Sequence, residues 1–292
     1  MSEPTGVIHD IGYRHYDGAR LGRGHAVAAL VVHSLRGVFG LGRTARAKIA
    51  PFLLVGVMML PAVVSIAVMA LLKQEVMTYT QYGVTMQAVL AIFLAAQSPY
   101  TVAPDLRFRV LPLYLSRPVS LWDYVGAKLA AMVVAMFLLL AVPLTVLYIG
   151  EVVVDLPGPA HTGDYLTAMA GAVVYALLLA SIGVAIASFT PRRGLGVASV
   201  IAFYLLTSAV STVVAATMES VNNETAAAWA LMINPFFLVE AAVQVGLFGA
   251  VPSAPVVYPG GMGVVVANLI VVALIALSVT ALILRYRKAA AR

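Results

Sequence analysis

Long uncharged runs of apolar residues dominate the chain and alternate with short polar connections. Six of these runs are long enough to cross, as helices, a hydrocarbon layer about 30 Å thick. The six runs cover residues 49–72, 76–103, 129–149, 165–189, 194–218 and 263–284. The pattern predicts an all-α membrane protein in which residues 46–292 form a six-span transmembrane domain.

A shorter helical pattern precedes the first run. Within residues 26–41 the apolar positions recur at helical spacing and form one face, whereas histidines and arginines cluster on the opposite face. The apolar face consists of Val27, Leu30, Val31, Leu35, Val38 and Phe39. We expect residues 25–45 to form an amphipathic (elbow) helix in the lipid headgroup plane, after a polar cytoplasmic segment, residues 1–24. The alternative is a surface helix of a soluble subdomain.

One further apolar segment, residues 225–251, is also about long enough to span. Asn234 and Pro235 interrupt it, because proline lacks a backbone donor and disfavours helix in the residue before it. A full crossing would also leave Glu240 deep in lipid at a cost of about 2.5 kcal/mol or more. We therefore expect an extracellular re-entrant helical hairpin that packs on the other spans. A seventh span is the alternative.

The composition agrees with lipid as the solvent. Apolar residues make up 62% of the 292 and charged residues 10%, and the mean hydropathy is +0.98. Soluble domains have about 25% charged residues, so the large apolar excess needs a membrane to cover it.

The positive charges lie almost entirely on one side of the predicted spans. With both termini in the cytoplasm, 17 of the 18 Lys and Arg residues face inward, and Lys73 alone faces outward. The sequence predicts a multi-pass protein of the bacterial inner (plasma) membrane with both termini cytoplasmic. The net charge of +6 is a topology signal, so we expect no nucleic-acid partner.

Several kinds of chemistry are missing from the sequence. Its four lysines precede Ile, Gln, Leu and Ala, so no Walker lysine followed by Ser or Thr is present. The chain has no cysteine and no HExxH motif, and His25 and His33 are too far apart on one helix to pair directly. We expect no catalytic residue, no metal site and no cofactor on this chain, which is therefore not expected to be an enzyme.

The acidic residues argue against an ion-coupled carrier. None of the twelve Asp and Glu residues lies within the six predicted spans, whereas ion-coupled transporters usually have carboxylates or histidines at membrane depth.

The cytoplasmic connection at residues 104–120 differs from the other connections. Its sequence, PDLRFRVLPLYLSRPVS, combines three arginines and three prolines with an aromatic and aliphatic cluster. We expect Pro104 to end the second span and a short helix to follow, kinked or restarted at Pro112 and closed at Arg117 and Pro118. So much apolar surface between arginines is typical of a docking element. The alternative is a loop whose arginines only fix topology.

At these residues the chain resembles the type-2 permeases of ABC transporters. The likeness is carried by YLSRPVSLWDYVGAKL after the second span, by INPFFLVEAA before the last span, and by the overall plan of six spans after an elbow helix. The N-terminal YRHYDGARLGRG is similar to the leader of permeases from actinobacteria. The resemblance implies a membrane subunit of an exporter that works as a dimer of permeases, homo- or heterodimeric. ATP and Mg²⁺ would be held by a separate ATP-binding cassette subunit.

The resemblance also implies roles for individual residues. The loop would couple to the ATPase through Asp105, Arg107, Phe108, Arg109, Leu111, Leu113 and Tyr114. Candidate residues along the transport pathway are Met58, Met59, Gln87, Gln97, Tyr204, Thr207 and Ser208. Such a lining of soft apolar and hydroxyl groups suits a hydrophobic or amphipathic cargo, a small molecule, lipid or peptide. An ion-coupled secondary transporter and a non-transporting membrane scaffold or regulator are the alternative functions.

Overall fold

The computed structural model describes residues 12, 18, 21–108, 110–115, 119–154, 159–190 and 192–291. Within these residues all regular structure is helical. The elements in chain order are α1 (Arg23–Val38), α2 (Ala45–Leu72), η1 (Tyr79–Gln81), α3 (Tyr82–Thr85), α4 (Gln87–Arg107), α5 (Leu111–Leu115), α6 (Leu121–Val154), α7 (Thr162–Phe189), α8 (Arg193–Ser220), α9 (Glu224–Leu231), α10 (Pro235–Val239), the π-helix η2 (Glu240–Val245) and α11 (Met262–Ala290). The predicted polar segment, residues 1–24, lies largely outside the described residues.

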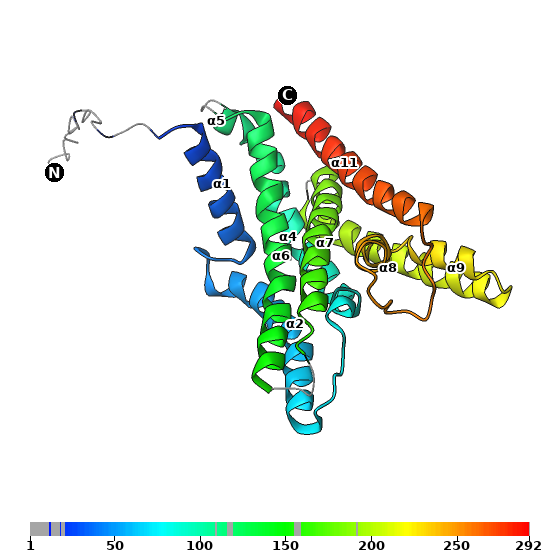
Figure 1. Cartoon of the computed structure of the whole chain (residues 1–292). Coiled ribbons are helices and arrows are strands. Elements are labelled where there is room, and N and C mark those ends of the chain that lie inside the picture. The colour runs from blue at the N-terminus through cyan, green and yellow to red at the C-terminus, as the bar shows by residue number, and fades with distance from the viewer. Residues whose placement is uncertain are drawn as a thin grey trace.

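The long helices form one bundle around α6 and α7 (Figure 1). Helix α1 packs along α6 on one side, while α8, α9 and α11 lie on the other side of α7. Helix α7 is the most buried of the long apolar helices. The start of α1, the short helix α5 and the C-terminus gather at one end of the bundle (Figure 1).

The described residues contain five to seven elements that are long and apolar enough to span a membrane. Within the described residues, α2, α6, α7, α8 and α11 are each long and apolar enough to cross a bilayer, and two bent helix pairs bring the total to seven if each counts as one span. The predicted six spans require the first bent pair to cross and the second to return to its own side. That arrangement stays a prediction.

The predicted span at residues 76–103 is not one straight helix. It consists of Tyr79–Thr85 followed by Gln87–Arg107, with a bend of 55° between them. The bend brings the backbone of Gly83 against α7, where a Cβ on this residue would lie 2.7 Å from the ring of Tyr175. The break between the two helices therefore allows this segment to pack closely on α7.

Pro104 does not end the second span, contrary to the sequence prediction. Helix α4 contains Pro99 and Pro104 and continues to Arg107. The Phe108 N–H donates to the Pro104 carbonyl over 2.9 Å and closes the last turn. A proline removes the hydrogen bond of its own nitrogen, but its carbonyl still accepts one, so a helix can pass through it.

The amphipathic helix before the first span is present as α1. Its predicted apolar face packs inward: Val38 is buried and Leu30, Leu35 and Phe39 pack against the core. The helix ends earlier than the predicted boundary at residue 45, and Gly40, with a positive φ of 68°, turns the chain toward α2. This face covers α6 and α4. The interfacial position of α1 stays a prediction.

The segment predicted as a re-entrant hairpin is two short helical pieces joined at a sharp bend. The axes of Glu224–Leu231 and Pro235–Val245 differ by 107°. The Asn234 side chain caps the second piece by accepting from the Phe236 N–H over 3.0 Å, and Pro235 occupies the first helical turn. The expected packing of this hairpin on the long helices is confirmed by its contacts with α7, α8 and α11.

Candidate functional site

An apolar groove of about 510 Å³ lies between α4 and α8, with α10 at its end. It is lined by Gln87, Ala88, Ala91, Ile92, Ile201, Tyr204, Leu205, Ser208 and Phe236. Three of the residues predicted to border a transport pathway, Gln87, Tyr204 and Ser208, are therefore brought together. They come from two helices more than 110 positions apart in sequence, so only the packing of α4 on α8 could join them.

The polar groups of the groove are held in place by the hairpin and by α7. The Gln87 Oε1 accepts from the Asn234 Nδ2 over 2.9 Å, which ties the start of α4 to the bend of the hairpin. The Tyr204 hydroxyl donates to the Leu179 carbonyl over 3.2 Å, and its ring lies 5.9 Å from that of Phe236. The groove is thus a mainly apolar surface with a few fixed polar groups, a combination typical of sites for amphipathic ligands.

The other predicted pathway residues do not line this groove. Met58 and Gln97 are buried in the bundle, and Met59 is half-buried. The Thr207 hydroxyl donates to the Phe203 carbonyl over 3.0 Å, within its own helix.

The predicted coupling residues separate into an inner and an outer set. In the inner set, the Asp105 carboxylate pairs with the Lys128 ammonium at 2.9 Å and also accepts from the Tyr124 hydroxyl. Leu111 is only 2% exposed. Asp105 and Leu111 therefore fix α4 and α5 to the bundle, and the Leu111 side chain is not available at the surface.

The outer set consists of Arg107, Phe108 and Leu113, which lie at the surface where α4 ends and α5 follows. Phe108 is 68% exposed and Leu113 is 71% exposed, and Arg107 stands over the Phe108 ring, 5.5 Å from its centroid. Arg109, Arg117 and Pro118 lie outside the described residues.

Three tyrosines hold α5 in place. The Tyr114 ring lies 5.0 Å from that of Tyr124, which lies 5.9 Å from that of Tyr286 near the end of α11. Aromatic pairs at these distances attract each other beyond their simple burial. The short helix thus rests on α6 and α11. Sequence reasoning missed Tyr124, Lys128 and Tyr286, because they lie in or beside predicted spans.

A second anchor joins the start of α1 to the start of α6. The Arg23 guanidinium donates to both carboxylate oxygens of Asp123, over 2.7 and 2.9 Å. Asp123 also accepts from the backbone and hydroxyl of Ser120, which is a capping-box arrangement. The hydrogen bond and charge of Asp123 raise the pKa of Arg23 above its ordinary value.

The hairpin buries one carboxylate completely. Glu240 is fully buried, and its two oxygens accept from the Ser253 N–H over 2.8 Å and from the Tyr258 hydroxyl over 2.9 Å. Both partners come from the loop before α11. Pro235 and Glu240 therefore have structural roles in shaping the hairpin and fixing the loop that follows it.

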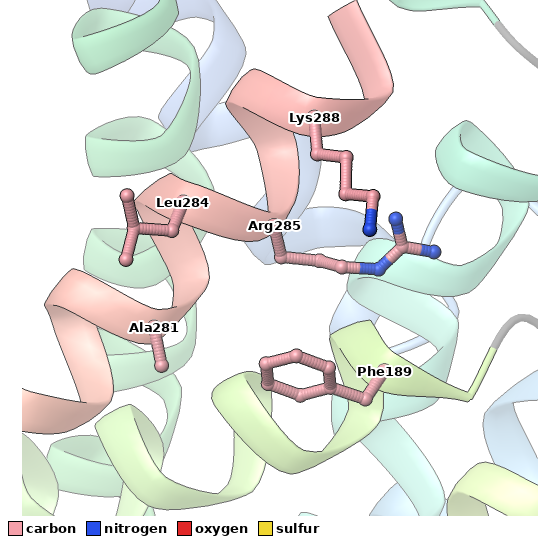
Figure 2. Close-up of a pocket in the computed structure, with 5 residues that line it drawn as sticks. All are labelled: Phe189, Ala281, Leu284, Arg285 and Lys288. Atoms are coloured by element: carbon pink, nitrogen blue, oxygen red, sulfur yellow. The ribbon is translucent and has the colours of Figure 1, made fainter. Parts of the chain in front are cut away.

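A basic hollow of about 550 Å³ lies between the ends of α7 and α11. Figure 2 shows the Arg285 and Lys288 side chains extending toward the same space, with the Phe189 ring below them. The Arg285 Nε donates to the Ser188 carbonyl over 3.2 Å, so this guanidinium is held at the end of α7. Two cations over apolar walls suit the headgroup region of anionic lipids.

In comparison with known proteins, no family model matched the chain, and no curated protein matched it.

Proposed function

We propose that the chain is the membrane permease subunit of an ATP-driven ABC exporter, with both termini in the cytoplasm of a bacterial cell. Its cargo would be a hydrophobic or amphipathic small molecule, lipid or peptide. A separate ATP-binding cassette subunit would supply ATP hydrolysis, and a second permease copy would complete the pathway. The assignment of the chain to this class still rests on the sequence resemblance.

The observation that carries the proposal is the end of the bundle formed by α4 and α5. Phe108 and Leu113 are large apolar side chains exposed to solvent there, while Asp105 and the tyrosines beneath them hold the segment rigid. An ATP-binding subunit can bind to an exposed apolar surface, and it can displace the end of α4 and α5 as one unit only if this segment is held rigidly. A loop that serves only to fix topology has no need of either feature.

The groove between α4 and α8 supports the same proposal. Its lining suits an amphipathic cargo, and it is bounded by α4, the helix that leads directly to the exposed surface. Movement of α5 by a partner would therefore reach the groove through a single continuous helix. The exposed apolar face of α8 would cover part of a second permease or meet lipid.

The proposal predicts that Phe108→Asp combined with Leu113→Asp abolishes permease-stimulated ATP hydrolysis without preventing membrane insertion. Both side chains are exposed, so the charges cost the fold little, but a carboxylate in an apolar interface is costly to desolvate. Leu111 is unsuitable for this test because it is buried. The assay is ATP hydrolysis by the complex purified from native membranes through a tag on this chain.

Val257→Asp is the matched control, since Val257 is 83% exposed in the loop before α11. It should leave ATP hydrolysis unchanged. Two results would contradict the proposal. One is full stimulation of ATP hydrolysis by the Phe108/Leu113 variant. The other is purification of the tagged wild-type chain from native membranes without any nucleotide-hydrolysing subunit.

An ion-coupled carrier is the second candidate. The buried carboxylate of Glu240 is the observation in its favour, since such carriers usually have a carboxylate within the membrane, but both Glu240 oxygens already accept hydrogen bonds from the loop before α11. The two candidates can be distinguished by measuring transport after the purified complex is reconstituted into lipid vesicles. Transport by an ABC exporter stops with vanadate and continues when a protonophore and a sodium ionophore collapse the proton and sodium gradients, and an ion-coupled carrier gives the opposite result.

A further inference from the structure

Residues from three segments meet at the end of the bundle opposite the C-terminus (Figure 1). Glu75 lies in the connection after α2, Glu151 in the last turn of α6, and His161 directly before α7. One oxygen from each carboxylate and one ring nitrogen of the histidine lie within 4.8 Å of one another. The three residues form a compact cluster outside the groove and outside the coupling surface.

Both carboxylates converge on the same ring nitrogen. The His161 Nδ1 lies 2.7 Å from the Glu75 Oε1 and 2.8 Å from the Glu151 Oε1. A ring nitrogen carries at most one hydrogen, so it cannot give two full hydrogen bonds at once. Even with a protonated histidine the cluster carries one surplus negative charge. A divalent cation among the three atoms would neutralise both carboxylates and leave the histidine neutral.

The cluster includes supporting hydrogen bonds of the kind that orient metal ligands. The Glu151 side chain is 4% exposed. Its Oε1 accepts from the His161 backbone N–H over 2.9 Å, and its Oε2 accepts from the Tyr79 hydroxyl. Glu151 is thus fixed from two sides. Glu75 and His161 are 42% and 44% exposed, so an ion and a water ligand have access from solvent.

We propose that Glu75, Glu151 and His161 bind a divalent transition-metal ion, with Zn²⁺ as the best match and water as the fourth ligand. Zinc takes imidazole nitrogen and carboxylate oxygen at about 2.0–2.2 Å, which places tetrahedral ligands roughly 3.3 Å apart. The two distances from the His161 nitrogen to the carboxylate oxygens, 2.7 and 2.8 Å, need to lengthen by only about half an ångström to reach that spacing. Calcium and magnesium prefer all-oxygen sites with more ligands.

The bound ion joins the α2 connection, α6 and α7 at this end of the bundle. It limits relative movement of these helices where the aromatic stack of Tyr148 and Tyr165, with ring centroids 4.5 Å apart, already fixes their spacing. This inference does not depend on the proposed transport function, because it concerns the chain alone.

The test is titration of the purified full chain in detergent with ZnCl₂ alone, after treatment with EDTA, followed by calorimetry and metal analysis. The variants are Glu75→Gln and His161→Gln, both at exposed side chains that tolerate substitution. Every protein also carries His25→Asn and His33→Asn, which removes the exposed histidines of α1 as competing ligands. Glu224→Gln is the control, since Glu224 is an exposed acid on another segment.

We expect one Zn²⁺ per chain, an affinity at least about tenfold weaker in the Glu75 and His161 variants, and an unchanged affinity in the Glu224 variant. Co²⁺ in place of Zn²⁺ should give the visible absorption of a four-coordinate nitrogen and oxygen site. The proposal would be overturned if all variants bound Zn²⁺ with equal affinity. It would also be overturned if the protein with Glu75 and His161 intact bound no more Zn²⁺ than the variant in which both residues are substituted. The cluster would then be an ion pair sharing one proton.

Discussion

At the scale of single residues, Asp105 shows how this chain accommodates charge beside its apolar core. Its carboxylate is 14% exposed and pairs with Lys128, whose side chain is 12% exposed. A nearly buried ion pair adds little compared with an apolar pair, but the loss of one partner leaves an uncompensated charge. The sequence analysis singled out Asp105 as a candidate coupling residue, but it gave no indication that Lys128 is its partner.

We predict that Lys128→Met destabilises the protein by about 2 kcal/mol, because among the described residues Asp105 then keeps the Tyr124 hydroxyl alone as a partner. Asp105→Asn in addition to Lys128→Met should restore most of this loss. The measurement is the unfolding midpoint in detergent for the wild type, the two single variants and the double variant. Additive losses in the double variant would show that the two groups are not coupled.

The pair of Glu151 and His161, at the opposite end of the bundle, behaves differently, because a histidine is involved. The hydrogen bond between Glu151 and the imidazole raises the pKa of His161 above its ordinary value. Glu151 and His161 are only ten residues apart, but Glu75 reaches them from another helix connection. In the sequence, His161 is a single histidine in a predicted outer loop, and nothing indicates that two carboxylates lie beside it. The sequence therefore predicted no metal site.

At the scale of elements, the hairpin is shaped by the two roles of Asn234. Its Oδ1 caps α10 by accepting from the Phe236 N–H, and its Nδ2 donates to Gln87 in α4. The sequence predicted the bend, since proline lacks a backbone donor and disfavours helix in the residue before it. The contact with Gln87, 147 residues away, depends on the tertiary fold.

We predict that Asn234→Ala destabilises the protein by about 2 kcal/mol, since it removes a helix cap and leaves the Gln87 oxygen without its buried donor. Asn234→Ser keeps the cap and loses the Gln87 bond, so its loss should be about half as large. Unfolding midpoints in detergent provide the comparison. Asn223→Ala is the matched control: Asn223 caps α9 by accepting from the Ala226 N–H in an exposed hydrogen bond, and only the cap contribution should be lost there. An alanine variant at Asn234 as stable as the serine variant would argue against the cap.

The elements also show where proline patterns mislead. Pro104 was expected to end the second span, and the helix passes through it to Arg107. Pro235 was expected at a bend and lies at one. The difference is the residue before each proline, because Asn234 offers a side-chain cap that a helix can start from, whereas Ala103 offers none.

At the scale of the whole molecule, the distribution of charge predicts the orientation in the membrane. The start of α1, α5 and the end of α11 lie at one end of the bundle (Figure 1). Arg23 belongs to the start of α1, and Arg285, Arg287 and Lys288 belong to the end of α11. Grouping of the basic segments at one end is what the positive-inside rule requires of a cytoplasmic face.

Because the chain has no cysteine, single cysteines report orientation directly. We predict that Asn223→Cys reacts with a membrane-impermeant maleimide in intact cells and that Arg193→Cys reacts only after the membrane is opened. Both positions are exposed and lie at opposite ends of α8. Labelling of both cysteines from outside, or of neither, would contradict the predicted topology.

The sequence by itself determined the helical class, the membrane as solvent and the approximate extent of the long helices, because these follow from local hydrophobicity and length. It also located the hairpin bend and the short helix after the second span. Only the tertiary structure decided which side chains meet: Asp105 with Lys128, Gln87 with Asn234, and Glu75 with His161. These pairings depend on how helices pack, and in an apolar chain nearly every helix face offers similar hydrophobic contact, so the pattern alone does not select the neighbour.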